Sequence, residues 1–155
     1  MAFISPSKGP MTFDMMFEDL LGYVTEVPEA DYRLIVGTDS QARDDVHFVT
    51  AVVIHRLGKG ARYYYERRRH LPMASLRQRL YHETALSLHV GGQLAERLSK
   101  DEVEVDVEIH LDIGQNGATR DLIREIVGWV TGSGFDAKVK PDAYGASKVA
   151  DKHTK

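Results

Sequence analysis

Three carboxylates occupy positions where the surrounding pattern predicts apolar side chains or the end of a strand. Asp39 follows the apolar run of residues 34–36, and Asp112 lies near the end of a segment that alternates strictly between apolar and polar residues. Glu83 is more informative, because a helical wheel places it in the middle of an apolar stripe. A carboxylate that faces a protein core costs several kcal/mol if it is ionised and unpaired. Glu83 therefore requires a partner, either a basic side chain or a metal ion.

Together, the three carboxylates predict a site for divalent cations. Close carboxylates repel one another unless a cation neutralises them, and hard oxygen ligands select Mg²⁺ or Mn²⁺ over zinc. Two such ions can hold the attacking and leaving oxygens of a phosphodiester. Two plainer interpretations stay open. Asp39 and Asp112 are also typical of residues that begin a loop, and Glu83 is also compatible with a salt bridge to a base such as Arg33.

A basic segment predicts where a polyanion could bind. Residues 56–79 hold eight arginines and lysines and a single acid, Glu66, and three consecutive tyrosines interleave with the bases. Arginine matches phosphate geometry, and tyrosine rings offer a surface on which bases stack. The alternative is a solvated edge strand whose charges prevent aggregation. We expect nucleic-acid contacts from Arg62, Arg67, Arg68, Arg69, Arg77, Tyr64 and, from a second basic strip, Lys140.

The elements that must position these residues are visible in the hydrophobic periodicity. Thr12 is a candidate N-cap for a helix that Pro28 ends, and Ser75 with Gln78 resembles a capping box. The pattern predicts strands over 33–40, 47–56, 61–68, 103–113 and 135–140, and helices over 13–27, 75–98, 119–132 and 144–155. The order is an N-terminal helix followed by β-β-β-α-β-α-β-α, which predicts an α/β fold with a five-stranded mixed sheet and helices packed on it.

Composition narrows the class of protein. The 155 residues predict one domain, 1–155, with residues 1–30 as a lead-in and extra helix. The chain has no cysteine, which excludes disulfides, a thiol nucleophile and thiolate metal sites. Its net charge of −3 excludes a uniformly basic coat. No stretch approaches the roughly 20 apolar residues of a membrane span. We expect a cytoplasmic protein without a membrane partner, and a homo-oligomer stays open.

Several motifs resemble those of the ribonuclease H-like YkuK family. They are residues 5–9 (SPSKG), 36–41 (VGTDSQ), 110–114 (HLDIG), 116–120, 134–137 (GFDA), 140–142 and 149–152, so the likeness runs along the whole chain. In ribonuclease H-like proteins the acids that correspond to Asp39, Glu83 and Asp112 hold metal ions. The resemblance implies a fourth acid in or near the last helix, for which Asp151 is the best match and Asp142 the competitor. His110 shares the polar strand face with Asp112 and is a candidate proton-handling group.

The sequence therefore predicts a metal-dependent nuclease that hydrolyses phosphodiester bonds of RNA, DNA or a hybrid by a two-metal carboxylate mechanism. The main alternative is a non-catalytic ribonuclease H-like module that binds nucleic acid or protein. A third interpretation is nucleotide hydrolysis, because residues 112–119 faintly resemble the phosphate loops of actin-like ATPases. Those enzymes close two domains around ATP, whereas this chain predicts one.

Overall fold

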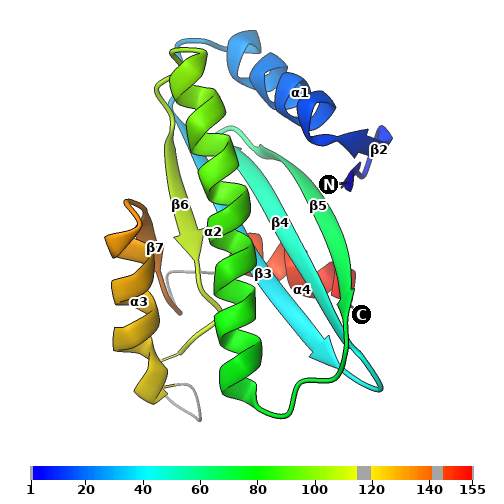
Figure 1. Cartoon of the computed structure of the whole chain (residues 1–155). Helices are drawn as coiled ribbons and strands as arrows, with labels where there is room; N and C mark the ends of the chain where they lie inside the picture. The colour runs from blue at the N-terminus through cyan, green and yellow to red at the C-terminus, as the bar shows by residue number, and fades with distance from the viewer. Residues whose placement is uncertain (1, 115–119, 141–144, 155) are drawn as a thin grey trace.

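The computed structural model describes residues 2–114, 120–140 and 145–154 and consists of one twisted sheet with helices on both faces (Figure 1). The described residues contain seven strands in the order β2-β1-β5-β4-β3-β6-β7. The strands are β1 (Ala2–Ser5), β2 (Gly9–Thr12), β3 (Tyr32–Ala42), β4 (Val46–Arg56), β5 (Ala61–His70), β6 (Asp106–His110) and β7 (Asp136–Lys138). The helices are α1 (Phe13–Glu26), α2 (Leu76–Lys100), α3 (Ile123–Gly132) and α4 (Gly145–Thr154), with a 3₁₀ turn at Arg120–Leu122.

The expected α/β class with a mixed sheet is confirmed, but the expected count of five strands is wrong. Residues 2–12 form a hairpin instead of a lead-in without strands, with β1 antiparallel to β2 and Ile4 paired with Tyr65 of β5. Each strand has four residues, which is too short to display a clear alternation. Gly9 turns the chain with a φ of 76°, and Phe3 and Met11 are buried in the core. The hairpin therefore continues the sheet beyond β5.

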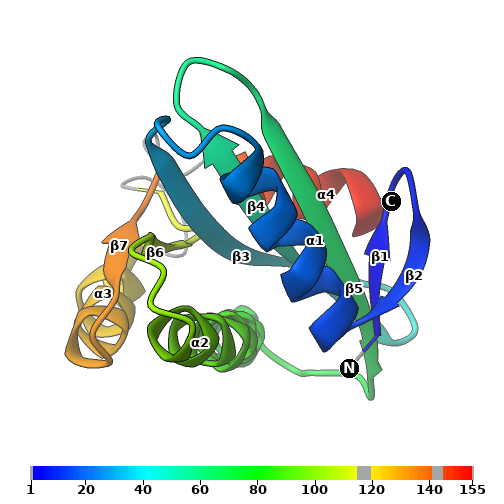
Figure 2. The same cartoon turned by 90° about the horizontal axis from the view of Figure 1, so that it is seen from above.

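Three helices share one face of the sheet, and α4 covers the other (Figures 1 and 2). The apolar faces of α1, α2 and α3 meet in the larger core, around Phe17, Leu94 and Ile126. On the far side, Ala146 and Ala150 of α4 pack in a smaller cluster that includes Val49. We call these the α2 face and the α4 face.

The two predicted N-caps of described helices are confirmed. The hydroxyl of Thr12 accepts a hydrogen bond from the backbone N–H of Met15 at 3.1 Å, and that of Ser75 accepts one from Gln78 at 3.1 Å. Thr119, the residue at which the third helix is expected to begin, lies outside the described residues. No helix in the described part of the chain is both long and apolar enough to cross a membrane.

The central strand β3 presents candidate site residues and packing contacts to both faces of the sheet. It is antiparallel to β4 and parallel to β6. On the α2 face, Thr38 shares a hydrogen bond with Ser87 of α2 at 2.8 Å. On the α4 face, a Cβ added to Gly37 would come within 2.9 Å of the Cβ of Ala146, so only glycine lets α4 lie this close. By the same alternation, Asp39 belongs to the α4 face.

The strand β6 is shorter than the alternating pattern predicted. Pairing with β3 covers residues 106–110 instead of 103–113, although the alternation itself holds, because Val107, Ile109, Leu111 and Ile113 are all buried in the larger core. Beyond His110 the chain bonds instead to the β7 side, where the N–H of Leu111 donates to the carbonyl of Lys138 at 2.8 Å. The ladder between β3 and β6 therefore ends just before the candidate carboxylates.

Candidate functional site

Asp39 and Asp112 occupy equivalent positions just beyond the parallel ladder between β3 and β6. The last pair of the β3–β6 ladder joins Gly37 to His110, and each aspartate follows its member of that pair by two positions. Parallel strands in register present equivalent positions on the same face. Asp39 is buried and Asp112 is partly exposed. Asp39 of β3 and Asp112, two residues beyond β6, thus both lie just past the end of this ladder.

Glu83 approaches the same end of the sheet from α2. Its side chain is only 7% exposed, which confirms that it faces the sheet. The hydroxyl of Ser40 donates a hydrogen bond of 2.5 Å to Glu83 Oε2, and the guanidinium of Arg79 donates to that hydroxyl and to the Ser40 carbonyl at 3.1–3.2 Å. The alternative salt bridge with Arg33 is wrong, because Arg33 pairs with Glu108 at 3.5 Å. No described base forms an ion pair with Glu83.

The electrostatics connect Glu83 to both aspartates. The pKa of Glu83 is raised to about 8, chiefly by burial and also by the negative charges of Asp39 and Asp112, while the Ser40 hydrogen bond and Arg79 act in the opposite direction. All three carboxylates are therefore within electrostatic reach of one another. They are not closed around a common point: among the described residues, no three acidic or histidine side chains are placed to hold one metal ion.

A small cavity separates Glu83 from Asp112. Its volume is about 10 Å³, and Thr38, Ser87 and His110 also line it. A cavity of about 10–15 Å³ is the minimum that accommodates a water molecule, so this one has room for a single water or a bare ion. The space lies between α2 and the chain that continues β6.

A lysine neutralises one of the carboxylates. The ammonium of Lys140 lies 2.6 Å from Asp112 Oδ1, and the backbone N–H of the same lysine donates to the carbonyl of Ile113 at 3.0 Å. The sequence suggested Lys140 as a contact for nucleic acid, but the structure places it on a candidate metal ligand. A cation at Asp112 must therefore compete with a built-in ammonium.

The fourth carboxylate lies beyond what the structure describes. Asp142 is outside the described residues. Asp151 belongs to α4, and its side chain is outside the described part of the chain. The choice between them stays a prediction. The loop that resembles actin-like phosphate loops is likewise outside the described residues from 115 to 119.

His110 is buried on the α4 face, next to Glu108. Its Nε2 lies 3.1 Å from Glu108 Oε1, so the imidazole donates to this carboxylate. Burial lowers the pKa of His110, which outweighs the opposite effect of Glu108. Nδ1 is buried and has no hydrogen-bond partner among the described residues. The ring therefore lies near Asp112 in sequence, but its bonded nitrogen points to a different acid.

Four of the arginines predicted to bind nucleic acid, Arg67, Arg68, Arg69 and Arg77, are exposed, but all four already have partners. Arg68 and Arg69 each pair with a nearby acid, at 2.9 and 2.5 Å, and Arg77 pairs with an acid of α3 at 3.4 Å. The Nε of Arg67 donates to the backbone carbonyl of His153 at 3.3 Å. Arg67 occupies the same row across the sheet as Asp39, through Val49 of β4. Of the predicted contacts, Arg67 is thus best aligned with the carboxylates.

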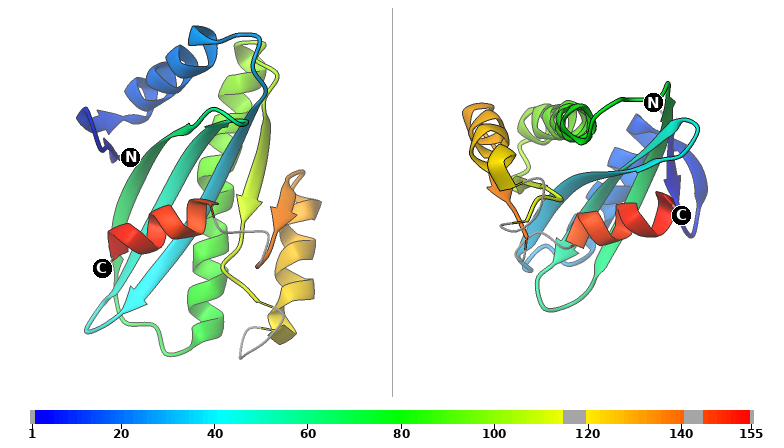
Figure 3. Two further views of the ribbon diagram at one scale, coloured as in Figure 1. Left: turned by 180° about the vertical axis from the view of Figure 1, so that it is seen from behind. Right: turned by 90° about the horizontal axis from the view of Figure 1, so that it is seen from below.

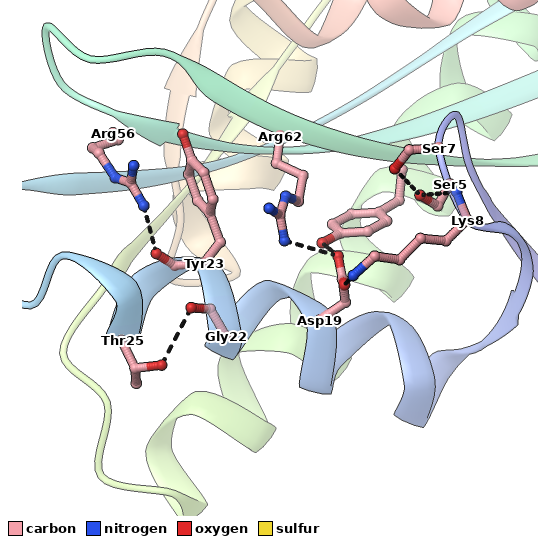
Figure 4. A network of polar contacts seen from close by, with 10 residues as sticks. Ser5, Ser7, Lys8, Asp19, Gly22, Tyr23, Thr25, Arg56 and Arg62 are labelled. Atoms are coloured by element: carbon pink, nitrogen blue, oxygen red, sulfur yellow. Dashed lines mark hydrogen bonds and ion pairs between the residues drawn. The ribbon is translucent and has the colours of Figure 1, made fainter.

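Two other predicted contacts belong to a structural network around Asp19 (Figure 4). Tyr64 is fully buried, and its hydroxyl donates a short hydrogen bond to Asp19. Arg62 pairs with the same carboxylate at 3.3 Å, and Lys8 also contacts it. These contacts lower the pKa of Asp19 against the opposing effect of burial. Tyr64 therefore has no ring face available for a base, and Arg62 ties β5 to α1.

Sequence reasoning missed Ser40 and Arg79, the two residues that hold Glu83 in place. Ser40 lies directly after Asp39, and strand alternation sends its side chain to the opposite face, where α2 packs. Arg79 lies one helical turn before Glu83. These spacings were available in the sequence, but the register of α2 on β3 was not.

Comparison with known proteins supports the family resemblance that the sequence motifs indicate. A family model described as "Ribonuclease H-like" matches residues 15–155. The chain is 36% identical, over 170 residues, to an uncharacterised protein, YkuK, of Bacillus subtilis (strain 168), and the match covers 99% of this chain and 96% of that protein. No solved structure matches the chain. The resemblance inferred from the sequence motifs is confirmed.

Proposed function

The chain belongs to the ribonuclease H-like family, and from this premise we propose that it is a metal-dependent nuclease that hydrolyses phosphodiester bonds of RNA, DNA or a hybrid. One observation carries the proposal. A buried glutamate, Glu83, faces the sheet where the β3–β6 ladder ends, close enough to Asp39 and Asp112 that the charges of both aspartates raise its pKa. A fold gains nothing in stability from collecting three acids in this way, whereas a site for cations requires it.

The residues fit Mg²⁺ or Mn²⁺ in kind. Asp39, Glu83 and Asp112 offer only hard carboxylate oxygens, and Asp151 or Asp142 is the proposed fourth ligand. When bound, the ions would activate water as the nucleophile and stabilise the charge that develops on the phosphate. Two features of the chain act on Glu83 before a cation binds. The Ser40 hydroxyl holds one carboxylate oxygen by a hydrogen bond, and burial disfavours the ionised form of the side chain in the absence of a cation.

Substrate binding is proposed to use the basic residues that stay exposed. Arg67 and Arg69 alternate onto the α4 face, the face of Asp39, whereas Arg68 belongs to the α2 face. Adjacent strands are about 4.8 Å apart, so Arg67 lies two strands, or about 10 Å, from the row position of Asp39. This spacing suits a phosphate next to the scissile one. Binding would exchange the carbonyl contact of Arg67 for a charged phosphate.

The test is a cleavage assay on single-stranded RNA, single-stranded DNA and an RNA/DNA hybrid, with Mg²⁺, with Mn²⁺ and with chelator. We expect metal-dependent cleavage that Asp39→Asn lowers by at least about 100-fold, as expected when a ligand of a catalytic cation is lost. Asp44→Asn is the matched control, because Asp44 is an exposed aspartate just after β3. If the Asp39→Asn variant cleaves as fast as the unsubstituted protein, the assignment of Asp39 as a ligand of a catalytic cation is refuted.

The second candidate is a non-catalytic module that binds nucleic acid or protein. Two observations favour it: Lys140 already neutralises Asp112, and no three of the described acidic or histidine side chains are placed to hold one ion. Calorimetric titration with Mn²⁺ separates the two. A nuclease site gives heat that depends on Asp39, whereas a module that lost its chemistry binds its partner equally well with chelator.

A further inference from the structure

A pocket on the α4 face has the size of a small-molecule site and lies apart from the carboxylates. Its volume is about 560 Å³, and strands β3 to β7 form its floor, with Val149 of α4 as one wall. Ligand pockets usually measure about 300–1,000 Å³. Figure 3 (left) shows α4 crossing the strands and leaving the sheet beyond it without a covering helix. Ile35, on the pocket floor, precedes Asp39 by four residues of β3, or about 13 Å along the strand.

The pocket changes character across the sheet. Its β4–β5 side is apolar and aromatic, with Val53, Ala61 and the ring of Tyr63. Its β6–β7 side is charged, with Glu108 and Lys138, and Arg33 of β3 lies next to them. A molecule that fills the whole pocket must therefore have an apolar or aromatic body at one end and a charged group at the other.

The charged end favours an anion. Glu108 is already satisfied on both oxygens, because Arg33 Nε lies 3.5 Å from Oε2 and His110 Nε2 lies 3.1 Å from Oε1. The terminal nitrogens of Arg33 make no hydrogen bond with a described residue, and Lys138 forms no ion pair within the described ranges. Two cations with unused donors thus face one neutralised acid. Arginine and lysine donors in this arrangement bind phosphate.

We propose that this pocket binds a nucleoside monophosphate. The base would lie on the apolar side against Tyr63 and Val53, and the phosphate would take the free donors of Arg33 and Lys138. The same unit occurs as a free mononucleotide and as the 5′-phosphorylated end of a strand. The inference does not depend on the nuclease proposal, because neither Asp39 nor a metal ion takes part.

Calorimetric titration in chelator tests the pocket. The probes are the four ribonucleoside 5′-monophosphates, a 5′-phosphorylated dinucleotide, adenosine and inorganic phosphate. We expect a monophosphate or the phosphorylated dinucleotide to bind roughly tenfold more tightly than adenosine or phosphate alone. Adenosine fills only the apolar end of the pocket, and phosphate fills only the charged end. Stronger binding of the mononucleotide identifies a free nucleotide as the ligand, and stronger binding of the dinucleotide identifies a strand end.

Two variants locate the binding. Lys138→Gln removes one free cation from an exposed position, and Ala61→Trp fills the apolar end from an exposed position. Each should weaken nucleotide binding by about tenfold or more, while Lys100→Gln, an exposed lysine at the end of α2, should leave it unchanged. Asp39→Asn should also leave it unchanged, which keeps this test separate from that of the nuclease.

Three results would overturn the proposal. They are the absence of heat with every nucleotide, equal affinity for adenosine and its monophosphate, and unchanged binding in both pocket variants. A chain that binds no nucleotide and sediments as a dimer, with Ala61→Trp monomeric, would instead identify this face as a contact between copies.

Discussion

Replacing Glu83 by glutamine should stabilise the metal-free protein at neutral and alkaline pH. The physical reason is the burial of this carboxyl, which raises its pKa from 4.5 to about 8. A folded-state pKa above the unfolded value means that the group favours folding while it is protonated. This contribution is complete below pH 4.5 and is lost as the pH rises towards 8.

The magnitude follows from the difference between the two pKa values. From 4.5 to about 8 is about 3.5 pH units, and at about 1.4 kcal/mol for each unit the contribution amounts to about 5 kcal/mol. Glutamine resembles the protonated acid and does not titrate, and Ser40 can still donate to its carbonyl oxygen. The free energy of unfolding of the variant, minus that of the unsubstituted protein, should therefore increase by several kcal/mol between pH 5 and pH 9.

The assay is urea unfolding in chelator at pH 5, 7 and 9. Glu96→Gln is the matched control, because it makes the same substitution at an exposed position of α2 and should show no such trend. A stability difference for Glu83→Gln that stays constant over this pH range would refute the reasoning, because the carboxyl would then titrate normally. When Mn²⁺ replaces the chelator, the unsubstituted protein should become more stable, and the glutamine variant should be unaffected.

Three further predictions concern single contacts. Lys140→Gln should tighten Mn²⁺ binding by roughly two- to fivefold in calorimetry, because it removes an exposed competing ammonium; weaker binding would contradict this role. Gly37→Ala should cost about 1–3 kcal/mol in urea unfolding, because its Cβ would lie 2.9 Å from that of Ala146, whereas Gly22→Ala, with open space in α1, should be neutral or stabilising. Tyr64→Phe should lower the free energy of unfolding by about 1.5–3 kcal/mol, because it removes a hydrogen bond to a carboxylate. Nucleic-acid affinity in a filter-binding assay should stay the same. Reduced affinity in a normally folded variant would place the ring at the interface.

The burial of Glu83 was predictable because a helix repeats every 3.6 residues over many turns. A stripe of apolar residues fixes the buried side of α2, and a single acid within it is recognisable without a structure. The ends of β3 and β6 were predictable for a similar reason, since their apolar residues mark the strands. The class of the fold and the identity of the three acids follow from these local signals.

The contacts that decide the state of the site depend on register, which no local pattern contains. The pairing of Lys140 with Asp112 requires the return of the chain from β7, and the hydrogen bond from Ser40 to Glu83 requires the position of α2 along β3. Tyr64 is instructive in another way. Strand alternation separates it from its two tyrosine neighbours and sends it to the core, so its burial could have been predicted.

Anomalous scattering from crystals that contain Mn²⁺ tests the central claim most directly, namely that Asp39, Glu83 and Asp112 form a cation site where the β3–β6 ladder ends. We predict a manganese peak in contact with carboxylate oxygens of Asp39 and Asp112, with Lys140 displaced from Asp112, and no peak in crystals of Asp39→Asn. A map without manganese at these carboxylates, or a peak of equal strength in the Asp39→Asn crystals, would contradict the account.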